Sequence, residues 1–90
     1  MLNDDLFTTL RELRSTIAKE KHIPAYMIFS DATLLDICQK KPTTEAEFLS
    51  VTGVGDSKLQ KYGAQFLKAV QEYLVHDITA AAQEIEAKMQ

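Results

Sequence analysis

The residues with the clearest chemical potential lie at positions 52–63, TGVGDSKLQKYG. Gly53 and Gly55, one residue apart, predict a tight turn, and the polar residues after them can begin a helix. A turn of this kind exposes backbone N–H groups at a helix N-terminus, where they attract phosphate oxygens. Lys58 and Lys61 follow at a spacing of three, which places both ammonium groups on one face of that helix. The stretch is therefore a candidate phosphate-binding site.

Two interpretations of this turn stay open on the sequence alone. In the first, the turn resembles a helix-hairpin-helix element, which grips the nucleic-acid backbone without reading the base sequence. In the second, the turn is only a short connection between two helices, in which glycine permits their close approach. The residue types are compatible with both interpretations.

Residues 22–35, HIPAYMIFSDATLL, form the most apolar connection in the chain. Pro24 fixes its own φ and has no N–H, so it resists continuation of the helix before it. Tyr26 begins a run of four large side chains that ends at Phe29, and such a run cannot simply lie in water. We expect most of the run to fold into the core and to anchor the helices on either side, with Tyr26 as the exception.

Signatures of catalysis and of metal binding are missing from the sequence. There is no G-x-x-x-x-G-K-[ST] phosphate loop, and no serine or cysteine has an evident base partner. His22 and His76 lie far apart and have no clustered Cys, Asp or Glu at ligand spacing. Cys38 lies in an apolar helical pattern and is interpreted as a buried thiol. We therefore predict no catalytic site, no metal site and no cofactor in this chain.

Composition limits the class of protein further. Ninety residues, 46% of them hydrophobic and 26% charged, are typical of one small globular domain. No apolar run reaches the length of a membrane span, and the single cysteine and the lack of a signal pattern predict a reducing, intracellular compartment. The net charge of -3 argues against a strongly basic nucleic-acid binder. Residues 1–75, however, carry nine Lys/Arg against ten Asp/Glu, so a local basic patch remains compatible with the sequence.

Apolar periodicity predicts an all-α fold, a compact bundle of about five short helices. The helices are expected from about residues 3–5 to the connection at 22, at 31–40, directly after Thr44, from 56 or 57 to a break at Gly63, and from about 64 to 74. Asp77 would fall within the apolar stripe of the last helix. We therefore expect the packed domain to span residues 1–75, with residues 76–90 forming a helical or frayed tail.

In this order of elements the chain resembles the HRDC domain, the helicase and RNase D C-terminal domain. The resemblance covers residues 6–74 and rests on two runs together, P-x-Y-x-I-F-x-D-x-T-L from Pro24 and G-V-G-x-x-K-L-x-x-Y-G from Gly53. It is strongest for bacterial RecQ-type ATP-dependent DNA helicases, in which the domain lies at the C-terminal end. The resemblance implies a five-helix bundle that accompanies a catalytic core, with the ATP and metal chemistry outside these residues. It also implies a cytoplasmic, nucleoid-associated bacterial protein acting in DNA repair and recombination.

The resemblance implies weak, sequence-independent binding of single-stranded or branched DNA, with Tyr26 in contact with a base. An exposed tyrosine can stack on any base, whereas the alternative for Tyr26 is a core aromatic residue with a tethered hydroxyl. The candidate backbone contacts are Lys40, Lys41, Lys58, Lys61, Gly53 and Gly55. The weaker candidates, otherwise solvated charges along one flank of the first helix, are Arg11, Arg14 and Lys21.

Two alternative functions remain on the sequence. One is a protein-interaction or intramolecular regulatory module with little affinity for DNA, in which the parent helicase core or another protein is the partner. The other is the RNA-binding auxiliary domain of an RNase D-type exonuclease. In each case we expect a monomer without a membrane partner.

Overall fold

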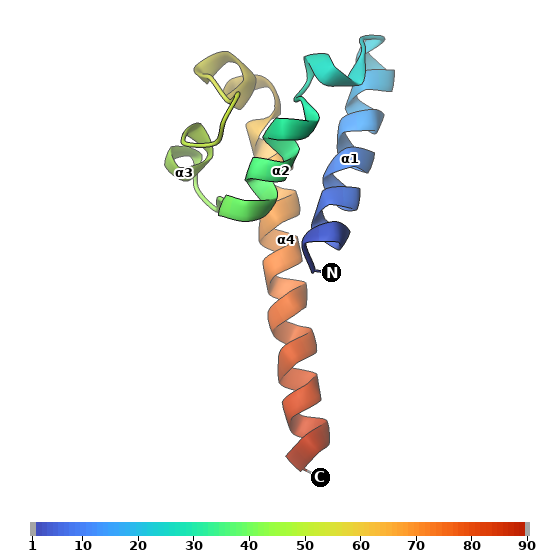
Figure 1. The fold of residues 1–90 in the computed structure, drawn as a ribbon, viewed down its shortest axis with the longest axis vertical. Helices are drawn as coiled ribbons and strands as arrows, with labels where there is room; N and C mark the ends of the chain where they lie inside the picture. Colours follow the sequence, from blue (N-terminus) through green and yellow to red (C-terminus); the bar gives the residue numbers. More distant parts are fainter. Residues whose placement is uncertain (1, 90) are drawn as a thin grey trace.

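The computed structural model of the chain describes the backbone of residues 2–89 and the side chains of residues 6–76. The elements follow one another in the order α1 (Leu2–Lys21), the single-turn 3-10 helix η1 (Ala25–Met27), α2 (Asp31–Lys40), α3 (Glu45–Leu49) and α4 (Asp56–Met89) (Figure 1). The described backbone contains no strand, and the predicted all-α class is confirmed. α1 begins at Leu2, so residues 3–5, predicted to cap this helix, lie within its first turn instead.

The helix predicted to end at Gly63 does not end there. α4 continues through Gly63, so the last two predicted helices are one. Gly63 is buried, and a Cβ built on it would lie 2.7 Å from Leu59 Cδ1. Glycine at this position therefore makes room for the Leu59 side chain rather than stopping the helix. An interior glycine costs about 1 kcal/mol relative to alanine, and burial of the flanking Tyr62 and Phe66 offsets this cost.

The C-terminal half of α4 projects past the other helices (Figure 1). Val70 is fully buried, and Tyr73 and Leu74 pack against the edge of the core. The apolar stripe predicted for residues 78–89 and the predicted position of Asp77 concern side chains outside the described ones. The division into a domain at 1–75 and a tail at 76–90 therefore remains a prediction.

The core is built around the Phe29 ring. This ring packs edge-on against Phe66, with 4.9 Å between centroids, and lies 6.0 Å from Phe48 and 6.1 Å from Tyr62. Ile28 and Phe29 are fully buried, which confirms that part of the apolar connection folds into the core. α3 and α4 thus contact the ring of a residue that belongs to neither helix, and α1 contacts the carbonyl of the same residue through Arg14.

Side-chain caps define where the shorter helices begin. Ser30 Oγ accepts a hydrogen bond from the Thr33 N–H at 3.2 Å and caps α2. Thr44 Oγ1 accepts one from the Glu47 N–H at 3.2 Å and caps α3, as its spacing predicts. The Glu47 carboxylate reaches back one residue further than in a standard capping box, because it accepts from both the N–H and the hydroxyl of Thr43.

The residue that directly follows α1 has a left-handed conformation. His22 has φ 57, and the Ile23 N–H donates to the Ala18 carbonyl at 3.0 Å, the pattern of a Schellman cap. A side chain in this conformation is strained, whereas glycine is not. We expect His22→Gly to raise the free energy of unfolding by about 0.5–1 kcal/mol in urea denaturation followed by circular dichroism. His22→Ala, which keeps the Cβ, is the control and should show no gain, and equal gains for the two variants would contradict this account.

No helix in the described part of the chain is both long enough and apolar enough to span a bilayer.

Candidate nucleic-acid interface

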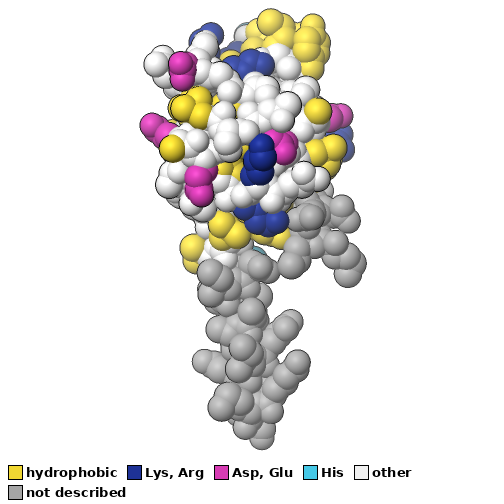
Figure 2. All heavy atoms as spheres, turned by 60° about the vertical axis from the view of Figure 1, so that its left-hand side comes forward, with side chains coloured by type: hydrophobic (Ala, Val, Ile, Leu, Met, Phe, Trp, Pro, Cys, Tyr) yellow, Lys and Arg dark blue, Asp and Glu magenta, His cyan; other side chains and the backbone are white. Residues whose placement is uncertain are grey.

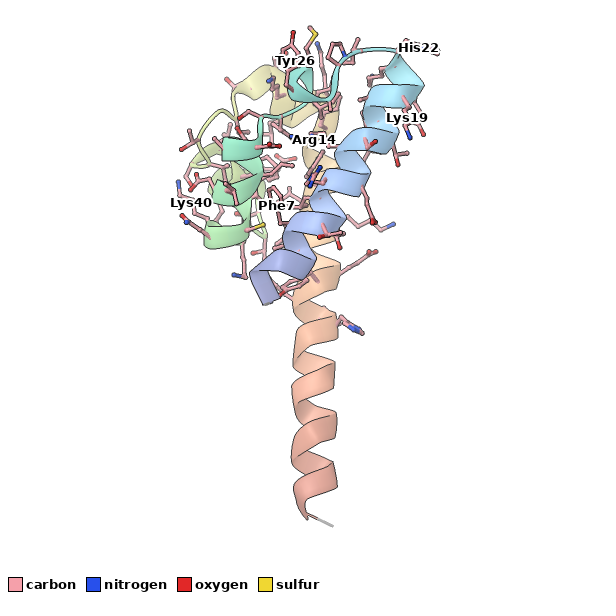
Figure 3. The ribbon with its side chains drawn as sticks, turned by 45° about the vertical axis from the view of Figure 1, so that its right-hand side comes forward. Phe7, Arg14, Lys19, His22, Tyr26 and Lys40 are labelled. Carbon is pink, nitrogen blue, oxygen red and sulfur yellow. The ribbon has the colours of Figure 1, made fainter. Side chains whose placement is uncertain are left out.

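The connection between α1 and α2 presents two large apolar side chains to solvent. Tyr26 is 69% exposed and Met27 is 49% exposed. Tyr26 lies at the end of the bundle opposite the C-terminus of α4, in the region of His22 (Figure 3). The alternative in which Tyr26 is a core residue is therefore wrong, because its ring lies outside the packed interior. Met27 is a second exception in this apolar run, which the sequence pattern did not predict.

The local backbone explains why the run splits into an exposed and a buried half. Pro24 is extended, with φ -61 and ψ 146, and its carbonyl accepts the Met27 N–H at 3.1 Å. The Ala25 carbonyl accepts the Ile28 N–H at 3.0 Å, which closes one 3-10 turn. Ala25 packs against the core on one side of this turn, whereas Tyr26 and Met27 point away from it.

Two lysines from distant parts of the sequence meet one aromatic pair. The Nζ of Lys21, on α1, lies 5.6 Å from the Tyr62 ring centroid, and the Nζ of Lys58, on α4, lies 5.7 Å from that of Phe29. The Phe29 and Tyr62 rings are themselves in edge contact. Contacts of this kind contribute about 0.5–1 kcal/mol at exposed sites and hold the long side chains in place. Lys21, one of the weaker candidate phosphate contacts, therefore packs on the same aromatic pair as Lys58.

We call the surface formed by Lys21, Tyr26, Met27 and Lys58 the apical surface. Figure 2 shows hydrophobic side chains at this end of the molecule with basic ones beside them and an acidic one at the same height, and both acidic and basic side chains on the flank below. Lys61 is exposed one turn after Lys58 on α4, on the same side of the helix. The apical surface combines exposed apolar groups with two held ammonium groups, a combination that suits a flexible polyanion with unstacked bases.

The two glycines of the G-V-G turn have different structural roles. Gly53 has φ 82, and a Cβ on it would collide with Thr33 Oγ1, so the fold itself requires glycine there. Gly55 has no neighbouring atom within 4 Å of a Cβ position, and its carbonyl accepts the Leu59 N–H at 2.9 Å at the start of α4. The interpretation of the turn as a helix connection thus explains Gly53. The surroundings of Gly55 remain open to a ligand.

The second predicted lysine pair, Lys40 and Lys41, lies away from the apical surface. Lys40 Nζ pairs with Asp36 Oδ2 at 3.0 Å and donates to the Ser50 carbonyl at 2.7 Å. Lys41 Nζ donates to the Cys38 carbonyl at 2.8 Å and so satisfies the end of α2. A ten-residue helix is about 15 Å long, and Lys40 lies toward the opposite end of α2 from Tyr26 (Figure 3). The structure does not bring Lys40 and Lys41 to the apical surface.

The two arginines predicted on the flank of α1 also differ from each other. Arg11 is exposed, with its guanidinium 5.8 Å from the Phe7 ring centroid. Arg14 is only 9% exposed, so the prediction of a solvated charge is wrong for this residue. Its Nη1 donates to the Phe29 carbonyl at 2.9 Å and pairs with Asp31 Oδ1 at 2.8 Å. The guanidinium is thus occupied within the fold.

The described side chains show no group of three His, Cys, Asp or Glu that could hold a metal ion. Cys38 is buried, as predicted, and its burial raises the pKa of the thiol. A raised thiol pKa opposes formation of the reactive thiolate at neutral pH.

Two carboxylates tie the α2–α3 region together and make its stability sensitive to acid. The Thr52 N–H and Lys40 hold the pKa of Asp36 below its usual value, and the N–H and hydroxyl of Thr43 do the same for the pKa of Glu47. A lowered pKa in the folded state means that the unfolded chain binds more protons in acid. The stabilisation from these groups is therefore present above about pH 4–5 and is lost as the pH falls.

We accordingly expect the Tm to fall between about pH 5 and about pH 3, and the fall to be shallower in Asp36→Asn and Glu47→Gln. Differential scanning calorimetry across this range measures the effect, and Glu45→Gln, in the same segment, is the control. A slope unchanged in both variants would show that other groups govern the acid response.

The chain is similar to known proteins in both sequence and structure. The family model of the HRDC domain matches residues 3–70. The solved structure of D. radiodurans RecQ HRDC domain 3 superposes with a TM-score of 0.77 at 38% identity, covering 80% of this chain and 95% of that one.

Relatives in sequence are longer proteins. Those from Pasteurella multocida and Bacillus subtilis, each named ATP-dependent DNA helicase RecQ, are both 45% identical to this chain, over 69 and 71 residues. The alignments cover 77% and 79% of this chain but 11% and 12% of those proteins. The ATP-dependent DNA helicase UvrD2 of Mycobacterium tuberculosis is 36% identical over 69 residues, which is 77% of this chain and 10% of that protein. The chain thus spans about a tenth of the length of these relatives.

Proposed function

Because this chain belongs to the HRDC domain family, we propose that it is an auxiliary nucleic-acid-binding domain of a RecQ-type DNA helicase. It binds single-stranded or branched DNA weakly and without base specificity, and so tunes the substrate choice of the catalytic core. The observation that carries the proposal is the apical surface, which comprises an exposed tyrosine and two lysines that each lie over a ring of the Phe29–Tyr62 pair. The relatives named as DNA helicases support this context.

On this proposal the apical surface makes two kinds of contact with DNA, stacking on bases and ion pairing with phosphates. Tyr26 stacks on an unpaired base, which contributes about 1–3 kcal/mol and does not depend on base identity. Met27 extends the apolar contact to a neighbouring base or sugar. Lys21, Lys58 and Lys61 pair with phosphates, and the Gly55 backbone allows the strand to approach the start of α4.

Weak binding is sufficient for an auxiliary domain. A domain tethered to a helicase core meets the DNA at an effective concentration set by its linker, commonly millimolar. The domain then adds affinity for particular DNA structures while the core supplies ATP hydrolysis. No catalytic step is assigned to these residues.

A protein-interaction role is the second candidate, and one observation favours it. Leu35 and Leu49 are exposed on α2 and α3, away from the apical surface, and Glu45 and Glu47 lie beside Leu49 in the sequence. Exposed leucines with acidic residues near them in the sequence suit a protein partner better than a polyanion. This role predicts no chemical-shift changes when the chain is titrated with oligo(dT).

The proposal is tested by titrating the isotope-labelled chain with oligo(dT) of about 12 nucleotides, followed by chemical-shift mapping. We expect shifts concentrated at Tyr26, Met27 and Lys58. With about three phosphate contacts, affinity should fall roughly tenfold between about 50 and about 150 mM salt. An RNA oligonucleotide of the same length separates the RNase D-type alternative. If no shifts occur at the lower salt concentration, the DNA-binding proposal fails for this domain.

A further inference from the structure

Arg14 connects the interior of the bundle to the segment that carries Tyr26. Its guanidinium donates to the backbone carbonyl of Phe29 and pairs with Asp31. Phe29 ends the buried half of the apolar run, and Asp31 begins α2. The guanidinium lies between α1 and α2, below Tyr26 (Figure 3).

The segment between α1 and α2 is thus anchored to α1 at both ends. At its start, the Ile23 N–H donates to the Ala18 carbonyl. At its end, the Phe29 carbonyl accepts from Arg14, which lies one helical turn before Ala18. Between the two anchors, the backbone hydrogen bonds of η1 fix the single turn that presents Tyr26. Besides the burial of Ile28 and Phe29, the position of Tyr26 therefore depends on two hydrogen-bonded anchors, and only the second of these is made by a side chain.

Stability alone does not account for a guanidinium at this place. Arg14 Nε is buried and has no hydrogen-bond partner among the described groups, and its carboxylate partner, Asp31, has a side chain that is 71% exposed. Burial of an incompletely satisfied charge is costly, and an apolar side chain of similar volume would avoid that cost. The groups that the guanidinium does satisfy are the ones that hold the Tyr26 segment.

We infer that Arg14 is a positioning residue for DNA binding, which acts by holding the Tyr26 segment through the Phe29 carbonyl rather than by contacting phosphate. The inference rests on the proposed function of Tyr26. It replaces the sequence-based interpretation of Arg14 as a phosphate contact, because its Nη1 contacts groups of the fold and the residue is only 9% exposed. The Phe29 ring also lies under Lys58, so the same anchor aligns both kinds of contact on the apical surface.

A double-mutant cycle with Arg14→Met and Tyr26→Ala tests the inference, using the dissociation constant for the same oligo(dT). We expect Arg14→Met to weaken binding about 3–10-fold when Tyr26 is present and less than twofold when Tyr26 is alanine. Equal weakening in both backgrounds, with a salt slope lower by about 0.7, would identify a phosphate contact and overturn the inference. An unchanged dissociation constant with reduced stability would identify a purely structural role and also overturn it.

Amide hydrogen exchange supplies a readout that does not need DNA. The Met27 and Ile28 amides, which close η1, should exchange faster in Arg14→Met while the Val70 amide stays protected. Unchanged exchange at Met27 and Ile28 would overturn the positioning role even if DNA affinity fell. If wild-type protein binds no oligo(dT), the proposed function fails, and exchange alone still decides whether Arg14 holds the segment.

A second variant covers the case in which Arg14→Met does not fold. Arg14→Lys keeps the positive charge but shortens the side chain and replaces the planar guanidinium, whose Nη1 makes both contacts, with a more strongly hydrated ammonium group. We expect faster exchange at Met27 and Ile28 and an affinity about 2–3-fold weaker in this variant, which corresponds to roughly half the coupling free energy lost in Arg14→Met. Wild-type exchange and affinity in Arg14→Lys would show that charge alone suffices, which contradicts the inference.

Discussion

Replacement of Phe29 by alanine is expected to lower the free energy of unfolding by about 3–5 kcal/mol. The ring is fully buried and contacts aromatic residues on α3 and α4, so its removal leaves a cavity that no single helix can close. A domain of this size has a total stability of about 5–13 kcal/mol, so the substitution removes between about a quarter and all of it. Urea denaturation monitored by circular dichroism measures the change.

Two further variants make this prediction specific. Phe29→Leu, which refills much of the volume, should lose about 1–2 kcal/mol. Leu35→Ala removes an exposed apolar side chain from α2 and should change stability by less than about 0.5 kcal/mol. A loss for Phe29→Ala no larger than that for Leu35→Ala would show that the aromatic cluster does not organise the core.

Replacement of Tyr26 by alanine is expected to weaken oligo(dT) binding about 5–150-fold, the equivalent of one stacked base. The fold should be unaffected, because the ring is 69% exposed and its removal opens no cavity. Fluorescence anisotropy with a labelled oligonucleotide measures the affinity, and thermal unfolding checks the fold. The prediction therefore separates a binding role from a structural one in a single variant.

Matched controls define what the Tyr26 result means. Tyr26→Phe keeps the ring and should retain affinity within about twofold, since stacking does not need the hydroxyl. Leu49→Ala removes an exposed apolar side chain away from the apical surface and should leave affinity unchanged. Affinity unchanged in Tyr26→Ala would refute stacking, and lost affinity in Leu49→Ala would move the interface to α3.

Local signals in the sequence were sufficient for most of the helices. Pro24, the capping residues Ser30 and Thr44, and the apolar spacing of α1 act within one or two turns of the chain, so they can be interpreted without tertiary information. The signal at Gly63 was misleading for a physical reason. A glycine can end a helix or admit a neighbouring side chain, and only the contact with Leu59 distinguishes the two.

In the candidate site, too, some features follow from the sequence alone and others only from the tertiary structure. The sequence by itself determined the family, the all-α class, and the presence of Tyr26 in an apolar connection after a helix-breaking proline. Only the tertiary structure decided which cations accompany Tyr26. Lys21 and Lys58 are distant in sequence, and each lies over one of the two rings, Tyr62 and Phe29, that are in contact in the core.

The burial of Arg14 is the clearest feature that the sequence alone did not predict. Its position beside the apolar stripe of α1 predicts a solvated charge, yet the packing of α2 across that flank buries it. Periodicity reports which face of a helix a residue occupies, but burial depends on whether another element covers that face. The fold class follows from patterns within helices, whereas the interface follows from contacts between them, and those contacts exist only after the core has closed around Phe29.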